Sequence, residues 1–179
     1  MAVVRGFQRL YLVAFLLLVI AIVIPVIVRV ALLSHQPAIE IARPDGRRRM
    51  ITLSQMKRLP SLTCTGTYQN QFGNWRDEGV YTGVRLTDLF GTGAEYELIR
   101  VVATDGYTIE VERRRVEDPG YPMILAYAYN GVEVPSWEMG FRIAVLPEDG
   151  NVGNEEYGVP SAGSFWVKNV GQIVLIEVP

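Results

Sequence analysis

The feature that most constrains this chain is an apolar run near its N-terminus. Residues 10–33 form a stretch of 24 residues in which Arg29 carries the only charge. As an α-helix with a rise of about 1.5 Å per residue, the run reaches roughly 36 Å, which exceeds the hydrocarbon thickness of a bilayer, about 30 Å. Pro25 lies within the run, and transmembrane helices tolerate such a residue. The sequence therefore predicts one transmembrane helix over residues 10–33, with the lipid bilayer as its partner.

A cleaved signal peptide is the alternative interpretation of this run. Signal peptides carry an apolar core of about 7–15 residues that is followed by a small-x-small cleavage site. The run here is longer, and no clean site of that kind follows it. We therefore expect residues 1–36 to comprise a tail, a transmembrane anchor and a linker, and residues 37–179 to form one domain of ordinary size. The formal net charge of −2 gives no basic footprint, so a nucleic-acid partner is not expected.

From residue 37 onward, short apolar runs alternate with turn signals, which is typical of strands. Three pairs favour tight turns: Asp45-Gly46, Asp105-Gly106 and Asn130-Gly131. Strands are predicted over residues 39–41, 99–103, 107–111, 142–146 and 173–178, while residues 123–129 fit either a helix or a strand.

Helical signals are fewer and shorter. Thr52 and Gln55 fit a capping box, which predicts a helix to about Arg58, before Pro60. Residues 86–90 form the other helical candidate, and residues 148–164 read as a loop of seventeen residues. The predicted class is α+β with a predominance of strand.

Cys64 is the one cysteine and His35 the one histidine of the chain. A protein-only zinc or iron–sulfur site needs about four donors, so these residues exclude that class of centre. A thiolate suits a soft or borderline transition metal. A molybdenum cofactor differs from other centres because its dithiolene supplies two sulfurs and the protein needs to give only one thiolate. The other interpretation is that Cys64 is a small buried residue, which is common for a free cysteine.

Several short sequence phrases follow one another in a characteristic order. They are Cys64-Thr65-Gly66, Tyr81-Thr82-Gly83-Val84, Leu86-Thr87-Asp88-Leu89, Asp105-Gly106-Tyr107, Leu125-Ala126-Tyr127, Asn130-Gly131, Gly140-Phe141-Arg142-Ile143 with Pro147, and Trp166-Val167-Lys168. Their order and spacing resemble the molybdopterin-binding domain of the sulfite oxidase family over roughly residues 39–178.

The resemblance implies a strand-rich, mixed sulfite-oxidase-like α+β fold in which Cys64 is the catalytic molybdenum ligand. It also implies that Ser164, Val167 and Lys168 line the pterin and its phosphate. Because membrane-attached relatives often lie outside the cytoplasm, we expect the same of this domain. The charge rule does not decide the orientation, since basic residues occur on both sides of residues 10–33.

A polar and aromatic loop, residues 70–75, follows Cys64 and fits a pocket wall. Packing over the edge of the sheet is the alternative. Glycines such as Gly66 let backbone approach a ligand, so we expect Gly66 and Asn70 to join Ser164, Val167 and Lys168 in binding the cofactor. Cys64 would then lie at the inner end of a cleft, beside residues 70–75 and 164–168.

The chain also departs from the family pattern. The family's His-Gly before the arginine-containing strand is Met139-Gly140 here, and residues 64–69 lack the arginine that binds oxyanions in sulfite oxidases. Two functional hypotheses result. The first is a membrane-anchored molybdopterin oxidoreductase that acts on a small substrate with a membrane redox partner. The second is a cofactor-free module that serves as a binding or structural accessory subunit of a membrane complex.

The anchor hypothesis predicts the behaviour of a truncated chain. The full chain should sediment with membranes and need detergent for release, because residues 10–33 match the thickness of a bilayer. A chain without residues 1–36 should remain in the supernatant. Cell fractionation followed by immunoblotting measures both. A full chain that stays in solution without detergent, or an N-terminus cut beyond residue 33, would contradict the prediction.

Overall fold

The computed structural model describes residues 19–25 and 36–177. The chain divides into two compact units, Met1–Gln36 and Pro37–Pro179. In the first unit, residues 19–25 are helical. No helix among the described residues is long and apolar enough to cross a membrane. Most of the predicted span of residues 10–33 lies outside the described residues, so the transmembrane helix stays a prediction.

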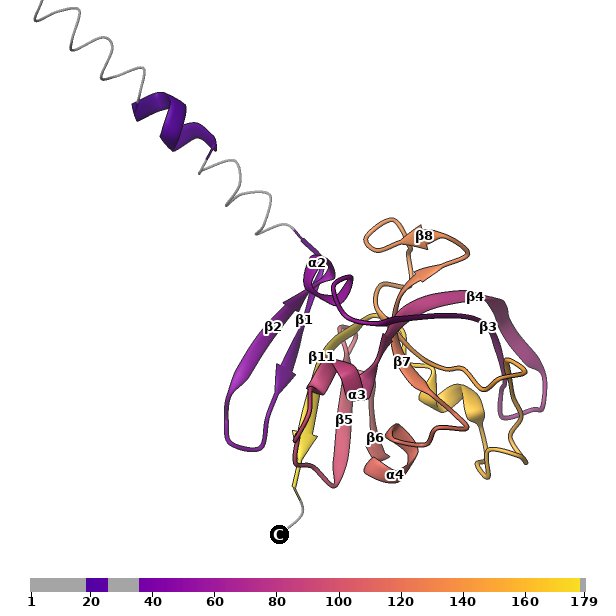
Figure 1. Cartoon of the computed structure of the whole chain (residues 1–179). Helices are drawn as coiled ribbons and strands as arrows, with labels where there is room; N and C mark the ends of the chain where they lie inside the picture. The colour runs from indigo at the N-terminus through magenta and orange to yellow at the C-terminus, as the bar shows by residue number, and fades with distance from the viewer. Residues whose placement is uncertain (1–18, 26–35, 178–179) are drawn as a thin grey trace, which may run out of the picture. The chain divides into compact units, whose positions relative to one another are not determined.

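Two mixed β-sheets build the second unit (Figure 1). The five-stranded sheet has the order β2 (Arg48–Thr52), β1 (Ala38–Ala42), β11 (Val170–Ile176), β5 (Leu98–Ala103), β6 (Thr108–Glu112). The six-stranded sheet has the order β10 (Asn151–Val152), β3 (Ser61–Gln69), β4 (Trp75–Arg85), β7 (Met123–Tyr129), β8 (Val132–Glu133), and β9 (Arg142–Val145) also pairs with β7. Both sheets are mixed because β1 pairs with β11, and β10 with β3, in parallel, while the other pairings are antiparallel.

Short helices connect the strands. They are α2 (Leu53–Met56), α3 (Leu86–Phe90), α4 (Arg113–Val116) and the 3₁₀ helix η1 (Ala162–Phe165). The predicted capping box is confirmed at α2. Thr52 Oγ1 accepts from the Gln55 backbone N–H at 3.3 Å, and Gln55 Oε1 accepts from the Thr52 N–H at 2.9 Å. The strand-rich α+β class is therefore confirmed, and its helices serve as short connections.

Local turn chemistry explains the hairpins. Asn130 and Gly131 both have positive φ, 49° and 80°, and they join β7 to β8. This geometry is typical of a primed two-residue turn, which suits Asn-Gly. Gly106 has a φ of 89° between β5 and β6, where the Asp105 carboxylate accepts from the Tyr107 N–H at 3.0 Å. Both turns were predicted from the sequence and are confirmed.

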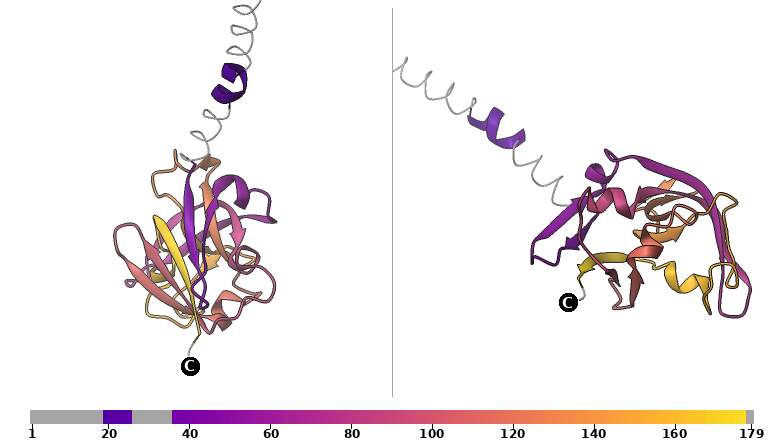
Figure 2. Two further views of the ribbon diagram at one scale, coloured as in Figure 1. Left: turned by 90° about the vertical axis from the view of Figure 1, so that its left-hand side faces the viewer. Right: turned by 60° about the horizontal axis from the view of Figure 1, so that its bottom comes forward.

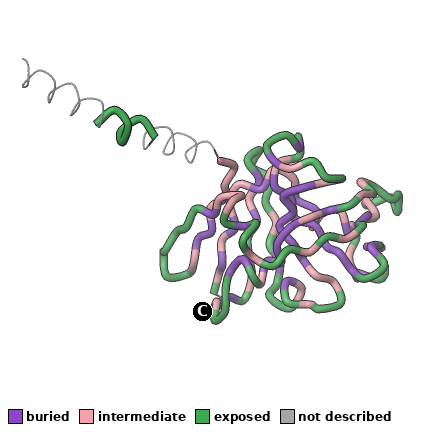
Figure 3. Tube along the Cα trace, turned by 45° about the horizontal axis from the view of Figure 1, so that its top comes forward, coloured by how far each residue is buried: buried purple, intermediate pink, exposed green. Residues whose placement is uncertain are grey.

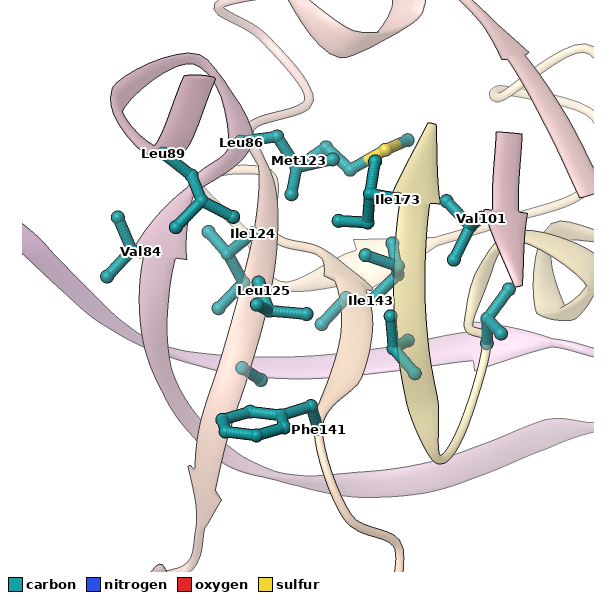
Figure 4. Packing of buried hydrophobic residues seen from close by; sticks show 14 of the residues in the cluster. Val84, Leu86, Leu89, Val101, Met123, Ile124, Leu125, Phe141, Ile143 and Ile173 are labelled. Carbon is teal, nitrogen blue, oxygen red and sulfur yellow. The ribbon is translucent and has the colours of Figure 1, made fainter. Parts of the chain in front are cut away.

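The core lies where β7 and β9 of the six-stranded sheet meet β5 and β11 of the other (Figure 4). All residues of β7 from Met123 to Ala128 are buried, as are the four residues of β9. Buried residues concentrate in these central strands, whereas many of the connecting turns are exposed (Figure 3). Because both faces of β7 are covered, its sequence is a continuous apolar run without alternation. The structure therefore resolves the ambiguity of residues 123–129 as a strand.

Three sequence expectations need correction. The first helix ends at Met56 rather than near Arg58. Helix α4 was not predicted, because its four residues include three arginines and show no apolar period. The predicted loop 148–164 contains strand β10 and helix η1. Strand β10 is only two residues long, and its parallel partner β3 lies more than 80 residues earlier, as in Asn151 with Thr67. Local sequence patterns therefore do not predict it.

The β3–β4 hairpin gives the domain its candidate site. It is long and curved (Figure 2), and its pairing shifts in register between Gly66 and Tyr68. Such a bulge bends a strand and redirects its side chains. Tyr68 and Asp77 lie near the turn of the hairpin, and Cys64 lies on the other side of the bulge, farther from the turn.

Candidate functional site

Cys64 lies on β3 opposite Tyr81 of β4. It is half-buried and packs against the edge of the hydrophobic core. Directly paired residues of an antiparallel sheet point to the same face, so Cys64 shares its face with the fully buried Tyr81 ring. The thiol is therefore not sealed in an aliphatic core, and it does not line the hollow described below.

Two glycines lie opposite each other on the sheet beside Cys64. Gly66 on β3 pairs with Gly79 on β4. A Cβ at Gly66 would lie 2.5 Å from the Leu146 side chain and 2.9 Å from the Trp166 ring. A Cβ at Gly79 would lie 2.2 Å from the Tyr129 ring. Gly66 was predicted to let a cofactor approach the backbone. In the structure the side chains of Leu146 and Trp166 take up that space.

These rings belong to an aromatic cluster of Tyr68, Tyr81, Tyr129, Trp137 and Trp166. The ring centroids of Tyr81 and Trp166 are 5.0 Å apart, as are those of Tyr68 and Trp166. Tyr129 lies 4.9 Å from Tyr81 and stacks on Trp137 at 5.6 Å, with 15° between the planes. The cluster forms a continuous row of rings over the glycine pair.

The guanidinium of Arg142 is enclosed by this cluster. Arg142 is only 2% exposed, and its Cζ lies 5.3–5.8 Å from the ring centroids of Tyr68, Tyr81 and Trp166. The negative faces of aromatic rings attract a cation at this range. The rings alone do not replace the water that a buried charge loses, so Arg142 also needs a carboxylate partner.

Asp77 is that partner, and it serves three donors at once. Arg142 Nη2 donates to Asp77 Oδ2 at 2.6 Å, and the Tyr68 hydroxyl donates to the same oxygen at 3.1 Å. Lys168 Nζ forms an ion pair with this oxygen at 3.3 Å. Asp77 has a φ of 52°, a left-handed conformation that aspartate tolerates better than most residues.

The surrounding charges and burial determine the protonation states of Asp77 and of the tyrosine hydroxyls beside it. Burial acts to raise the pKa of Asp77, but the hydrogen bond and charge of Arg142, the charge of Lys168 and the Tyr68 hydrogen bond outweigh it. The pKa of Asp77 therefore lies below its ordinary value of 3.8. Burial raises the pKa of Tyr68 and of Tyr81 above their usual range, so both hydroxyls stay protonated as donors. Tyr81 uses its hydroxyl to bond the Asp77 carbonyl at 2.6 Å.

A hollow of about 510 Å³ opens beside this group and is called the Asp77 hollow below. Asp77, Arg142, the stacked Tyr129 and Trp137, and Glu138 contribute to its walls. The volume and the aromatic lining are typical of small-molecule sites. Its full lining is Asp77, Tyr129, Asn130, Val132, Ser136, Trp137, Glu138, Met139 and Arg142.

The other residues predicted to bind the cofactor are engaged within the protein. The Asn70 side-chain oxygen accepts from the backbone N–H groups of Phe72 and Asn74, at 2.9 and 3.1 Å. Ser164 Oγ donates to the Ser161 carbonyl at 2.7 Å, and Val167 is 2% exposed.

These residues do not gather around the thiol. Asn70 follows the far end of β3, six residues beyond Cys64, which is a path of roughly 20 Å along the strand at about 3.3 Å per residue. The strand therefore leads loop 70–75 away from Cys64, and the predicted neighbourhood of the two is wrong. The structure does bring Gly66 and the segment of Trp166 to Lys168 together.

A molybdopterin does not fit this arrangement. The amide of Asn70, the hydroxyl of Ser164 and the ammonium of Lys168 each have a partner in the protein, and Trp166 covers Gly66. Within residues 19–25 and 36–177, no group of three or more His, Cys, Asp or Glu side chains is placed to hold a metal ion. Cys64 remains the one thiolate that the described part of the chain offers to a metal.

Sequence reasoning missed Asp77 and most of the aromatic cluster. Asp77 and Arg142 are 65 residues apart, and no spacing rule connects them. Trp166 was part of a recognised phrase, Trp166-Val167-Lys168, so a signal for that segment was present. The contact of the Trp166 ring with Gly66 joins residues 100 positions apart, so only the folded structure shows it.

Comparisons with known proteins bear on the fold. No family model matches the chain, and no curated protein sequence matches it. The chain is similar to a solved structure, the sulfane dehydrogenase SoxCD from Paracoccus pantotrophus, with a TM-score of 0.57 and 15% sequence identity. The match covers 79% of this chain and 38% of that one, so this chain spans well under half of its neighbour. At this identity the likeness shows the fold alone, which fits the sulfite-oxidase-like arrangement predicted from the sequence.

The ion pair predicts how stability depends on pH. Asp77→Asn leaves Arg142 buried without a counter-charge, so we expect the free energy of unfolding at pH 7 to fall by about 3 kcal/mol. Because the pKa of Asp77 is lowered by folding, its stabilisation is present above about pH 4 and is lost as the pH falls below that value. The wild type should therefore lose stability between about pH 4 and 2 more steeply than Asp77→Asn.

Urea unfolding at several pH values, followed by circular dichroism, measures both effects. Glu78→Gln is the matched control, because Glu78 is the exposed neighbour of Asp77 on the same strand. Equal stability of Asp77→Asn and the wild type at pH 7 would contradict the assigned role.

Proposed function

We propose that this chain is a binding module of sulfite-oxidase-like fold that works without a molybdenum cofactor and is tethered to a membrane by residues 10–33. One observation carries the proposal: Asp77 pairs with both Arg142 and Lys168. A cofactor phosphate needs free cationic donors. The Asp77 carboxylate already pairs with both cations, although Arg142 Nε has no hydrogen-bond partner among the described residues. The negative charge of the carboxylate would repel a phosphate that approached them.

The ligand site of the module is the Asp77 hollow. Asp77 and Glu138 bring two carboxylates to its walls, while Arg142 is the one cation there. Glu138 is exposed and makes no ion pair within the described residues, so it remains available to a ligand. The Tyr129 and Trp137 rings supply an apolar and π-electron-rich wall. Together these groups favour a small, partly apolar cation.

The position of Cys64 favours a second candidate function, a molybdopterin oxidoreductase. Its thiol is half-exposed on a strand, where the family resemblance places the molybdenum ligand. For this candidate, a cofactor would have to displace Trp166 from Gly66 and compete with Asp77 for Lys168. The proposal of a cofactor-free module requires neither change.

Metal analysis separates the two candidates. When the full chain is produced in a host that makes molybdopterin, we expect molybdenum and pterin far below one equivalent per chain, because Asp77 already pairs with Arg142 and Lys168. Elemental mass spectrometry and pterin fluorescence measure the two contents. Cys64→Ser should leave both contents unchanged, as should Thr63→Ser on the adjacent, exposed position of β3. Stoichiometric molybdenum that Cys64→Ser removes and Thr63→Ser retains would establish the oxidoreductase instead.

A cationic probe tests the Asp77 hollow. Benzyltrimethylammonium should bind the full chain and quench tryptophan fluorescence, because Trp137 lines the hollow. Glu138→Gln should weaken this binding about fivefold, since it removes the unpaired carboxylate. Glu148→Gln, an exposed carboxylate outside the hollow, is the control. Equal affinities for the wild type and Glu138→Gln would argue against this ligand class.

A further inference from the structure

A second hollow, of about 520 Å³, lies at the edge strand β2 and the end of α3. Three arginines from separate segments line it: Arg43 after β1, Arg49 on β2 and Arg58 after α2. Asp88 is the one acidic residue of the lining, which leaves a net charge of +2. We call this the arginine hollow. It shares no lining residue with the Asp77 hollow.

Two of the arginines are fixed in place by the end of α3. Arg43 Nη2 donates to the Phe90 carbonyl at 2.7 Å, and Arg49 Nη2 donates to the Leu89 carbonyl at 3.1 Å. A guanidinium carries five N–H donors, so each arginine keeps further donors for a ligand. Neither forms an ion pair within residues 36–177. The neighbouring Arg47 and Arg48, by contrast, pair with Asp45 and Glu40.

Arg58 is the most available of the three. It is exposed, and no described residue forms a hydrogen bond or ion pair with its side chain. The deeper lining of the hollow is apolar, with Ile51, Leu89 and Phe90 all buried. The hollow therefore combines cationic donors with an apolar floor.

We propose that the arginine hollow binds a phosphate group carried by a ligand with an adjoining apolar portion. Arginine recognises phosphate through paired, charge-assisted hydrogen bonds. A phospholipid head group and a soluble phosphate ester share this chemistry. The proposal does not depend on the function assigned to the Asp77 hollow, because the two sites have separate residues and opposite charge.

Two probes distinguish the sources. Inorganic phosphate and dihexanoylphosphatidic acid are each titrated calorimetrically into the full chain in a neutral detergent. Binding of both with similar affinity would show that the apolar floor takes no part, and would overturn the requirement for an apolar portion of the ligand. Tighter binding of the lipid shows that the apolar floor contributes to affinity, and identifies a phospholipid head group as the source of the phosphate. If neither probe binds, the proposal is overturned.

Variants locate the site. Arg58→Glu should weaken binding about tenfold, since it removes one charge-assisted contact. Arg76→Glu is the matched control, because Arg76 is also exposed and lies outside the arginine hollow. Asp88→Asn should tighten binding, a gain that a folding defect does not produce. Equal affinities for the wild type and Arg58→Glu, or equal losses in Arg58→Glu and Arg76→Glu, would overturn the proposal.

Discussion

The buried ion pair between Arg142 and Asp77 is the constraint on which the site depends. A guanidinium that is 2% exposed retains its charge only with a carboxylate and ring faces around it. The carboxylate comes from β4 at a left-handed residue, and the rings come from β3, β4 and the segment after η1. These segments must all be in place together, so the pair fixes the curvature of the β3–β4 hairpin and the path of the chain before β11.

The fold could be predicted wherever its cause is local. The turns at Asp105-Gly106 and Asn130-Gly131 and the capping box at Thr52 arise from the chemistry of adjacent residues, and the structure confirms them. The strand β7 was ambiguous, because an apolar run that is buried on both faces has no period. Strand β10 is two residues long and pairs with a partner distant in the sequence, and helix α4 is four residues long without an apolar period, so local patterns gave no sign of either.

The site could be predicted only in part. Chemistry alone singled out Cys64, since it is the one thiol of the chain. Lys168 was also singled out, but as a partner for phosphate, whereas the structure pairs it with Asp77. The difference arises from the register shift in β3–β4, which decides which side chains of the hairpin share a face. A sequence does not show such a shift, and consequently Asp77 escaped notice.

The position of β11 also constrains how the domain folds. This strand closes the described part of the domain in sequence, yet it pairs with β1 on one side and β5 on the other. The pairing of β1 with β11 joins residues about 130 positions apart, as in Glu40 with Gln172. Such non-local contacts carry a high loop-closure cost and slow folding. Until β11 is in place, the hairpin β1–β2 and the hairpin β5–β6 remain two separate ribbons with unpaired edges, which are open to pairing with other chains.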